Sequence, residues 1–428
     1  MSVVTPNHRS DNTSIAMPPI GKIPLSRVLA SLLAIAIIFW LASRKSFFED
    51  TLSSSFLAIA LFSIFLILLR TRTNWRELSA VLILFLGLAL LDIRILGFAI
   101  HWPVWPSFLG LASLIVLAFR VIWSDGSARR TALFVLIPSF LFAASEWCAS
   151  YFLDWTEIAH PKVLDLFLYS FDSSLHWQIA FYLGTLFQRF PYFALISVLF
   201  YLGLPIAIGL TFAGCLMRDR ENALPSFVAF LLTGPLGAVF YNIFPALGPI
   251  HLLPHNYPWH PLPMQAVSHL VLQPVALAGP RNAIPSLHAA WIFLVLYYSR
   301  RLSIPEKIAA VIFVVFTLLA TLGTGEHYFV DLVVAVPFAL LVAALTPCLI
   351  GRASTVLIAP IGSSLALILI WFALLRYEAH IFWISPVIPW GFCLVTLGIS
   401  YIAGRPAHTH RVQFEPTIAS TPSSAPTL

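Results

Sequence analysis

The sequence predicts an all-α polytopic membrane protein with about 12 transmembrane helices, and three observations support this. Of its 428 residues, 59% are hydrophobic and only 10% are charged, which is outside the range of soluble globular domains. The hydrophobic residues fall in runs close to the roughly 20 residues of helix that cross a bilayer core. The sequence also lacks the short alternating strands that a transmembrane β-barrel requires.

Twelve hydrophobic runs give the predicted spans. Short polar segments separate them, and the run 284–299 is the shortest and the most marginal as a span. The runs that begin near His288 and Asp331 start at polar motifs, so their boundaries are soft by a few residues. The predicted spans are 25–43, 52–69, 77–96, 107–123, 131–150, 191–213, 224–244, 284–299, 307–324, 329–348, 354–375 and 382–403.

The placement of Lys and Arg predicts that both termini are cytoplasmic. Loops rich in basic residues alternate with loops poor in them, and the rich loops hold most of the 24 Lys and Arg residues. This alternation puts the 245–283 loop and the Gly325–His327 turn on the same, extracytoplasmic, face of the membrane. If the source is bacterial, the membrane is expected to be the cytoplasmic (inner) one. Topology and contact with anionic lipid then explain the net charge of +6, without a nucleic-acid partner.

The chain divides into five predicted regions. A cytoplasmic tail precedes a five-helix transmembrane region, and a central region holds the polar motifs. Within the central region, the stretch 151–190 carries Asp154, Glu157, Asp165 and Asp172 among aromatic residues, and it predicts an interfacial helix pair. The final pair of spans precedes a disordered tail rich in Ser, Thr and Pro. The region boundaries are 1–24, 25–150, 151–350, 351–403 and 404–428.

The first polar motif runs from Gly279 to His288. Pro285 suits the first turn of a helix, where its missing N–H costs nothing. Ser286, Leu287 and His288 would then present free backbone N–H groups to an anion. Arg281, seven residues before His288, is predicted to reach back as a phosphate clamp. His288 would donate a proton to a leaving oxygen.

The second motif is Gly325-Glu326-His327-Tyr328-Phe329-Val330-Asp331. His327 and Asp331 are four residues apart, so on a helix they share one face. An aspartate bonded to one imidazole nitrogen fixes the tautomer and makes the other nitrogen a better nucleophile. Glu326 is predicted either to orient water or substrate, or to be an interfacial carboxylate without a special task.

Blander interpretations apply to other polar residues. A single interfacial histidine is usually a snorkelling polar group, but two histidines and an aspartate at these spacings favour chemistry. The irregular spacing of four histidines in the 245–283 loop argues against a metal site, and no metal or cofactor is expected. Asp92 and Arg94 are interpreted as a structural pair at a helix end, and the embedded Glu146 is a further charged candidate. The loop histidines are His251, His255, His260 and His269.

Together the motifs resemble a known family. Pro285-Ser286-Leu287-His288 and His327-Tyr328-x-x-Asp331 look like the second and third signatures of the type 2 phosphatidic acid phosphatase (PAP2) superfamily. The Leu before His288 and the Gly-Glu-His-Tyr form resemble its inositol phosphorylceramide synthase-like branch. The resemblance covers roughly 160–350 and implies a metal-free helical bundle with a phosphohistidine intermediate. It implies that His327 is the nucleophile, Asp331 its partner and His288 the acid. It also implies that Ser286 belongs to the phosphate pocket, mainly through its backbone N–H.

The chain also departs from the superfamily pattern. A Ser-Arg pair usually precedes the nucleophile, but Ala320-Thr321 stands there, and no Lys-x6-Arg-Pro precedes the second signature. The proline-rich stretch Phe244–Pro249 takes its place, as in the synthase-like branch. The basic grip on phosphate therefore falls to Arg281.

The sequence thus predicts a membrane lipid-phosphate phosphatase or phosphotransferase whose partners are a lipid phosphate and membrane lipids. Hydrolysis and transfer share the same first step, so they remain open, with inositolphosphotransferase-like transfer as one form. One rival is a membrane glycosyltransferase that uses the acidic pair Glu49-Asp50. The other is a transporter or non-catalytic lipid-binding protein. The glycosyltransferase leaves the two histidine motifs unexplained, and replacement of His327 by Ala would separate the phosphotransfer function from the rivals.

Overall fold

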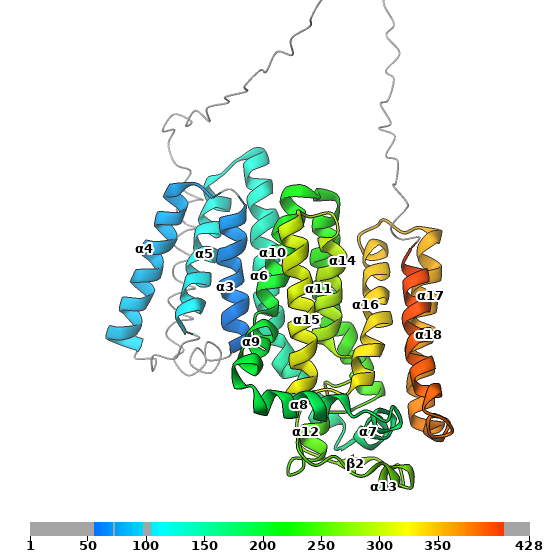
Figure 1. Cartoon of the computed structure of the whole chain (residues 1–428). Coiled ribbons are helices and arrows are strands. Elements are labelled where there is room, and N and C mark those ends of the chain that lie inside the picture. Colours follow the sequence, from blue (N-terminus) through cyan, green and yellow to red (C-terminus); the bar gives the residue numbers. More distant parts are fainter. Residues whose placement is uncertain (1–54, 72, 97–103, 406–428) are drawn as a thin grey trace, which may run out of the picture.

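The computed structural model describes residues 55–71, 73–96 and 104–405, and in this part of the chain nearly every element is a helix (Figure 1). The predicted all-α polytopic membrane fold is confirmed. Several predictions lie outside the described residues: the tail 1–24, the run 25–43, the Glu49-Asp50 pair, and the C-terminal tail beyond Arg405.

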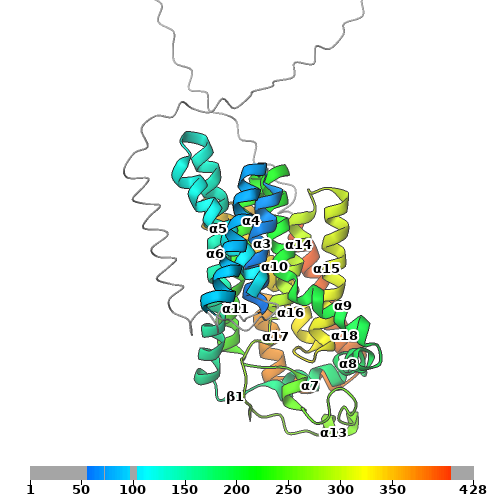
Figure 2. The same cartoon turned by 90° about the vertical axis from the view of Figure 1, so that its left-hand side faces the viewer.

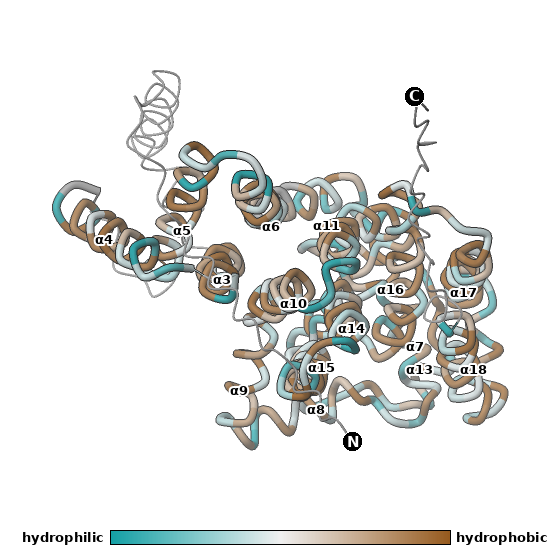
Figure 3. Tube along the Cα trace, turned by 90° about the horizontal axis from the view of Figure 1, so that it is seen from above, coloured by the Kyte–Doolittle hydropathy of each residue, from teal (hydrophilic) through white to brown (hydrophobic). Residues whose placement is uncertain are grey.

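The helices of the N-terminal region stand side by side at one flank of the molecule (Figure 1). Helix α3 packs against both α5 and α10, so it joins this flank to the centre, as the view along the helix axes shows (Figure 3). The elements are α3 (Ser55–Arg70), α4 (Trp75–Leu91), the π-helical turn η1 (Asp92–Leu96), α5 (Val104–Trp123) and α6 (Gly126–Ala159).

The central helices surround the two motifs. Helix α14 packs against α10, α11, α15 and α16, so the first motif enters the middle of the bundle. The central helices are α9 (Pro191–Leu202), α10 (Leu204–Arg218), α11 (Arg220–Ile243), α14 (Leu287–Ser299), α15 (Ile304–Gly323) and α16 (Phe329–Leu349). On the far flank, α17 and α18 pack against α16. This flank comprises η2 (Thr355–Leu357), α17 (Ile358–Tyr377), η3 (Ala379–Trp383) and α18 (Val387–Gly404).

Short elements form a layer across one end of the bundle (Figures 1 and 2). Two two-residue strands pair antiparallel, with Lys162 opposite Ala276 and Val163 opposite Val275. Nine of the ten residues of α7 are buried, so this helix is a core element of the layer. The layer comprises β1 (Lys162–Val163), α7 (Asp165–Ser174), α8 (Ile179–Arg189), α12 (Pro249–Leu252), α13 (Met264–Ser268) and β2 (Val275–Ala276).

The predicted count of about 12 spans is not confirmed. Among the described residues, seven helices are long and apolar enough to cross a membrane, or eight if the bent pair α8–α9 is one span. The run 191–213 divides at Gly203 into α9 and α10, and the runs that contain α3 and α14 give helices of only 16 and 13 residues. Helix α6 continues to Ala159, across the region boundary predicted at residue 150.

Large hydrophobic side chains also cover the outside of the bundle. Ile83 on α4 is 68% exposed, and Leu394 on α18 is 66% exposed. Exposed apolar surface of this extent is stable against lipid rather than water, which agrees with the brown outer faces of the helices in Figure 3.

An ion-pair cluster holds three helices together at the end opposite the motifs. Glu306, in the first turn of α15, pairs with Arg70 at the end of α3 and lies 3.6 Å from Arg218 at the end of α10. Its carboxylate also accepts from the backbone N–H of Ser303, which closes a capping box at the start of α15. These contacts therefore fix the position of α3 along its axis relative to α10 and α15.

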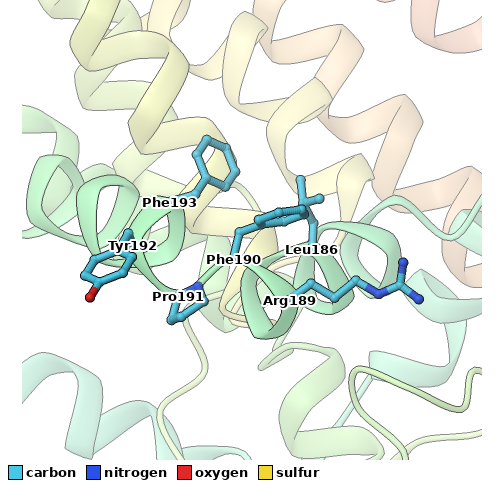
Figure 4. A pocket seen from close by; sticks show the side chains of 6 residues that line it. All are labelled: Leu186, Arg189, Phe190, Pro191, Tyr192 and Phe193. Atoms are coloured by element: carbon cyan, nitrogen blue, oxygen red, sulfur yellow. The ribbon is translucent and has the colours of Figure 1, made fainter.

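Helices α8 and α9 meet at a sharp elbow. Their axes differ by 118°, and Phe190 and Pro191 form the corner. An open recess of about 610 Å³ lies at this corner, as Figure 4 shows. It is lined by Leu186, Arg189, Phe190, Pro191, Tyr192 and Phe193.

Replacing Gly110 on α5 by alanine should destabilise the N-terminal region. A Cβ at this position would lie 2.2 Å from the carbonyl oxygen of Leu61 on α3, and backbone atoms cannot move away without separating the two helices. Overpacking of this kind costs about 1–3 kcal/mol. We expect Gly110→Ala to lower the midpoint of thermal unfolding in detergent. The control Gly87→Ala adds a methyl with no atom within 4 Å and should not lower it. Equal effects would contradict this packing.

Candidate functional site

His327 is buried where the two motifs meet. Its Nδ1 lies 2.9 Å from the carbonyl oxygen of Ala283 and 3.4 Å from Oδ2 of Asp331. Both partners are acceptors, so Nδ1 carries the proton and Nε2 presents a lone pair. The predicted tautomer is thus supported by two groups, and the nearer is a backbone carbonyl that sequence reasoning did not identify.

The pairing of His327 with Asp331 arises differently from the predicted helical one. Helix α16 begins at Phe329, so His327 precedes the helix instead of sharing a face with Asp331. Asp331 reaches back across the helix start, where its Oδ2 also accepts the backbone N–H of Tyr328 at 2.7 Å. This carboxylate is completely buried. A negative charge held there would stabilise positive charge that develops on the imidazole.

Ser286 joins the two motifs. Its hydroxyl oxygen lies 3.4 Å from Nε2 of His327, and its backbone N–H donates to the backbone carbonyl of Asp331 at 3.3 Å. Pro285 is not in the first helical turn as expected, because Ser286 is the N-cap and α14 begins at Leu287. The backbone N–H that was assigned to phosphate is already bonded, so in this conformation the side chain is what Ser286 offers to the site.

His288 lies two residues further on, between aromatic rings. Tyr201, at the end of α9, stacks on the imidazole with centroids 4.0 Å apart and planes 16° apart. Phe56 of α3 lies 5.5 Å away, and Trp291 stands edge-on at 6.0 Å. The indole N–H of Trp291 donates to the carbonyl of Phe230 at 2.9 Å, which fixes that ring. Rings from two other helices, α3 and α9, and one from its own helix therefore set the orientation of His288.

The structure corrects the expected role of Arg281. Its side chain is only 1% exposed, and its guanidinium donates to three backbone carbonyls instead of facing the histidines. Nε–H bonds the carbonyl of His160 at 2.8 Å, and the other two acceptors are Leu277 and Gly279. Glu157 lies 3.8 Å away. Arg281 thus anchors the loop before α14 to the end of α6, because its guanidinium donates to carbonyls of both segments. These buried carbonyls would otherwise lack a hydrogen-bond donor.

Two buried aspartates on α7 position the motifs, and sequence reasoning gave them no role. Asp165 accepts from the backbone N–H groups of Leu247 and Gly248 and, at 3.0 Å, from the hydroxyl of Tyr328. Asp172 accepts from Phe329 at 2.7 Å and Val330 at 3.2 Å, the first N–H groups of α16. The signal available was their seven-residue spacing, which puts both on one face of a helix.

The environment of these aspartates opposes their charge. Burial raises the pKa of Asp165 to about 7, although hydrogen bonds from Leu247 and Tyr328 act to lower it. Burial likewise raises the pKa of Asp172 to about 8, against the hydrogen bonds from α16. Each donor that reaches these carboxylates therefore offsets part of a desolvation cost.

A salt bridge closes the outer side of the loop Gly325–Tyr328, which precedes α16. Nε2 of His251 lies 3.4 Å from Oε2 of Glu326, and the N–H of Ile250 donates to the carbonyl of Gly325 at 3.0 Å. Gly325 has φ +81°, a conformation that favours glycine. The hydrogen bond raises the pKa of His251, and the same bond lowers the pKa of Glu326.

Across the described residues, no three His, Cys, Asp or Glu side chains gather in a group suited to a metal ion.

The central region also matches a known family by sequence. Residues 166–345 match the family model of the PAP2 superfamily. The match contains both histidine motifs and α7 through most of α16, and it leaves α3–α6 and α17–α18 outside. Neither the curated proteins nor the solved structures gave a match to the chain. The PAP2 superfamily comprises membrane phosphatases and phosphotransferases, so the match indicates chemistry of that type.

The salt bridge between His251 and Glu326 should stabilise the loop Gly325–Tyr328 most in mildly acidic solution. The ordinary pKa values of the two groups are 6.5 and 4.5, and between them both groups are charged even when unfolded. Stabilisation is lost as the pH rises through the raised pKa of His251, and also as it falls through the lowered pKa of Glu326. The side chains are 32% and 39% exposed, so we expect at most about 1 kcal/mol.

The measurement compares the thermal unfolding midpoints of wild type and His251→Gln near pH 6 and near pH 9. The difference should be larger near pH 6. His255→Gln, at an exposed position in the same loop, serves as the control. A His251 effect of the same size at both pH values would show that the pair contributes no ionic stabilisation.

Proposed function

We propose that this protein is an integral membrane lipid-phosphate phosphatase or phosphotransferase that works through a phosphohistidine on His327. The observation that carries this proposal is the hydrogen bond between Nδ1 of the buried His327 imidazole and a backbone carbonyl. With Nδ1–H bonded to the carbonyl of Ala283, Nε2 is the nitrogen that carries the lone pair, and the hydroxyl of Ser286 lies 3.4 Å from it. A neutral imidazole held in one orientation is the nucleophile that attack on phosphorus needs.

The first step forms a phosphorus–nitrogen bond and breaks a phosphorus–oxygen bond. Nε2 of His327 attacks the phosphorus, and His288, which takes up a proton when the substrate anion binds beside it, gives that proton to the leaving oxygen. The imidazole then carries positive charge, which the nearby carboxylate of Asp331 stabilises at 3.4 Å. The start of α14, beside which His327 lies, contributes the positive end of a helix dipole to the anion.

The second step regenerates the enzyme. Water or an acceptor hydroxyl attacks the phosphorus, neutral His288 takes up the proton, and the phosphorus–nitrogen bond breaks. Water releases inorganic phosphate, whereas a hydroxyl forms a new ester. The Gly-Glu-His-Tyr form of the second motif resembles the inositol phosphorylceramide synthase-like branch, which favours transfer as an outcome to test. We place this chemistry on the extracytoplasmic face, following the distribution of Lys and Arg.

The function is tested with purified protein in lipid nanodiscs and three labelled substrates: phosphatidic acid, a polyprenyl diphosphate, and phosphatidylinositol supplied with ceramide. Free phosphate indicates hydrolysis, and a new phospholipid indicates transfer. We expect His327→Ala to abolish turnover of the active substrate. His288→Ala should lower it by about 10²–10⁴-fold, the usual contribution of a general acid.

The control is His255→Ala, which removes an exposed histidine from the neighbouring loop and should leave turnover unchanged. Membrane insertion of each variant is checked by its monodisperse elution in detergent. Turnover that persists in well-folded His327→Ala would overturn the proposal. Formation of a glycosylated lipid, or substrate transport without any reaction, would instead support one of the rival functions.

A further inference from the structure

Helix α3 lies outside the segment that matches the family but reaches the proposed acid. Phe56, in its first turn, is 5.5 Å from His288 between ring centroids, with planes 52° apart. The same ring meets Tyr201 edge-on at 5.9 Å, and Tyr201 stacks on His288. One side chain from the N-terminal region and one from the central bundle therefore enclose the same imidazole.

Contacts along α3 fix the position of Phe56. Near its middle, Ser63 faces Gly209 of α10 so closely that a Cβ on that glycine would lie 3.1 Å from the serine Cβ. At its other end, Arg70 pairs with Glu306 of α15. Because both contacts join α3 to the central bundle, a shift of α3 that moved Phe56 away from His288 would break them.

The enclosing rings restrict His288 to a narrow range of orientations. No hydrogen bond to its imidazole is present among the described residues, so ring packing is what orients it. Stacking on Tyr201 fixes the plane of the imidazole, and Phe56 limits rotation about the side-chain bonds. A general acid is effective only when its nitrogen is within hydrogen-bonding distance of the leaving oxygen, so loss of this packing would slow proton transfer.

We propose that Phe56 and Tyr201 are positioning residues for His288, so that the N-terminal helical region completes the catalytic site. This inference rests on the proposed function, in which His288 protonates the leaving group. It assigns to α3 a role in catalysis beyond anchoring in the membrane. The acid is then oriented by helices from two parts of the chain, and the segment that matches the family would be less active alone.

The test uses two phosphate monoesters with different leaving groups. A short-chain phosphatidic acid has an alkoxide leaving group that needs a proton, whereas 4-nitrophenyl phosphate releases a stable phenolate without one. We expect Phe56→Ala to lower kcat for the alkyl ester about 10–100-fold and to change kcat for the aryl ester less than about 3-fold. His288→Ala should show the same selectivity with a larger loss. The double variant should be no worse than His288→Ala, because both act through one group.

Phe62→Ala is the matched control, since its ring pairs with Phe65 on the same helix. It should leave both rates unchanged. Phe56→Tyr keeps an aromatic ring and should restore most of the alkyl activity. If Phe56→Ala fails to fold, Tyr201→Leu provides the same test, with Tyr201→Phe as its conservative partner.

Equal losses on the two esters would overturn the inference, because they would indicate general damage to the site. Additive losses in the double variant would overturn it as well. Failure of the proposed function gives a different result, namely activity on both esters that persists in His327→Ala. The two ideas therefore fail in distinguishable ways.

Discussion

The position of the proposed nucleophile depends on two buried carboxylates of α7. Asp172 accepts the first N–H groups of α16, and Asp165 bonds the loop at Leu247 and Gly248 as well as the hydroxyl of Tyr328. Tyr328 directly follows His327, so Asp165 holds the side chain of the residue next to the proposed nucleophile, and Asp172 holds the backbone one residue further on, at Phe329. Burial of both aspartates costs free energy. The donors that offset this cost belong to the loop before α16, to the start of α16 and to the loop at Leu247 and Gly248. The loop is therefore tied to the bundle by hydrogen bonds to these two carboxyl groups, which hydrophobic packing alone would not supply.

A second set of bonds joins the two motifs into one site. The carbonyl of Ala283 orients His327, while the N–H of Ser286 bonds the backbone of Asp331. Movement of the start of α14 would thus shift the positions of His327, Asp331 and His288 together. This coupling explains how residues 41 positions apart, such as Ser286 and His327, act at one point in a helical membrane protein. It also means that substitutions in either motif will affect both steps of the proposed reaction.

Sequence reasoning identified the side chains of the site better than their surroundings. Spacing and residue type predicted that His327, Asp331 and Ser286 belong to one site, and the structure brings these side chains together. Arg281 was predicted to bind phosphate because it is the basic residue that precedes His288 in the first motif. The sequence does not show that the buried carbonyls of His160 and Leu277 lie within hydrogen-bonding distance of its guanidinium. The roles of Asp165, Asp172 and Phe56 depend on contacts between distant segments, which periodicity does not encode. The count of about 12 spans is not confirmed for a related reason, since a count of hydrophobic runs does not register a break such as that at Gly203.

The central claim is that a phosphoryl group is carried on Nε2 of His327. The most direct measurement mixes the protein briefly with a substrate labelled in its phosphate, quenches it in base, and maps the labelled peptide. A phosphorus–nitrogen bond is stable in base and breaks in acid, so we expect an acid-labile label on His327. The label should be absent from His327→Ala. A base-labile, acid-stable label on Ser286, whose hydroxyl lies 3.4 Å from Nε2, would contradict the account, as would turnover without any labelled protein.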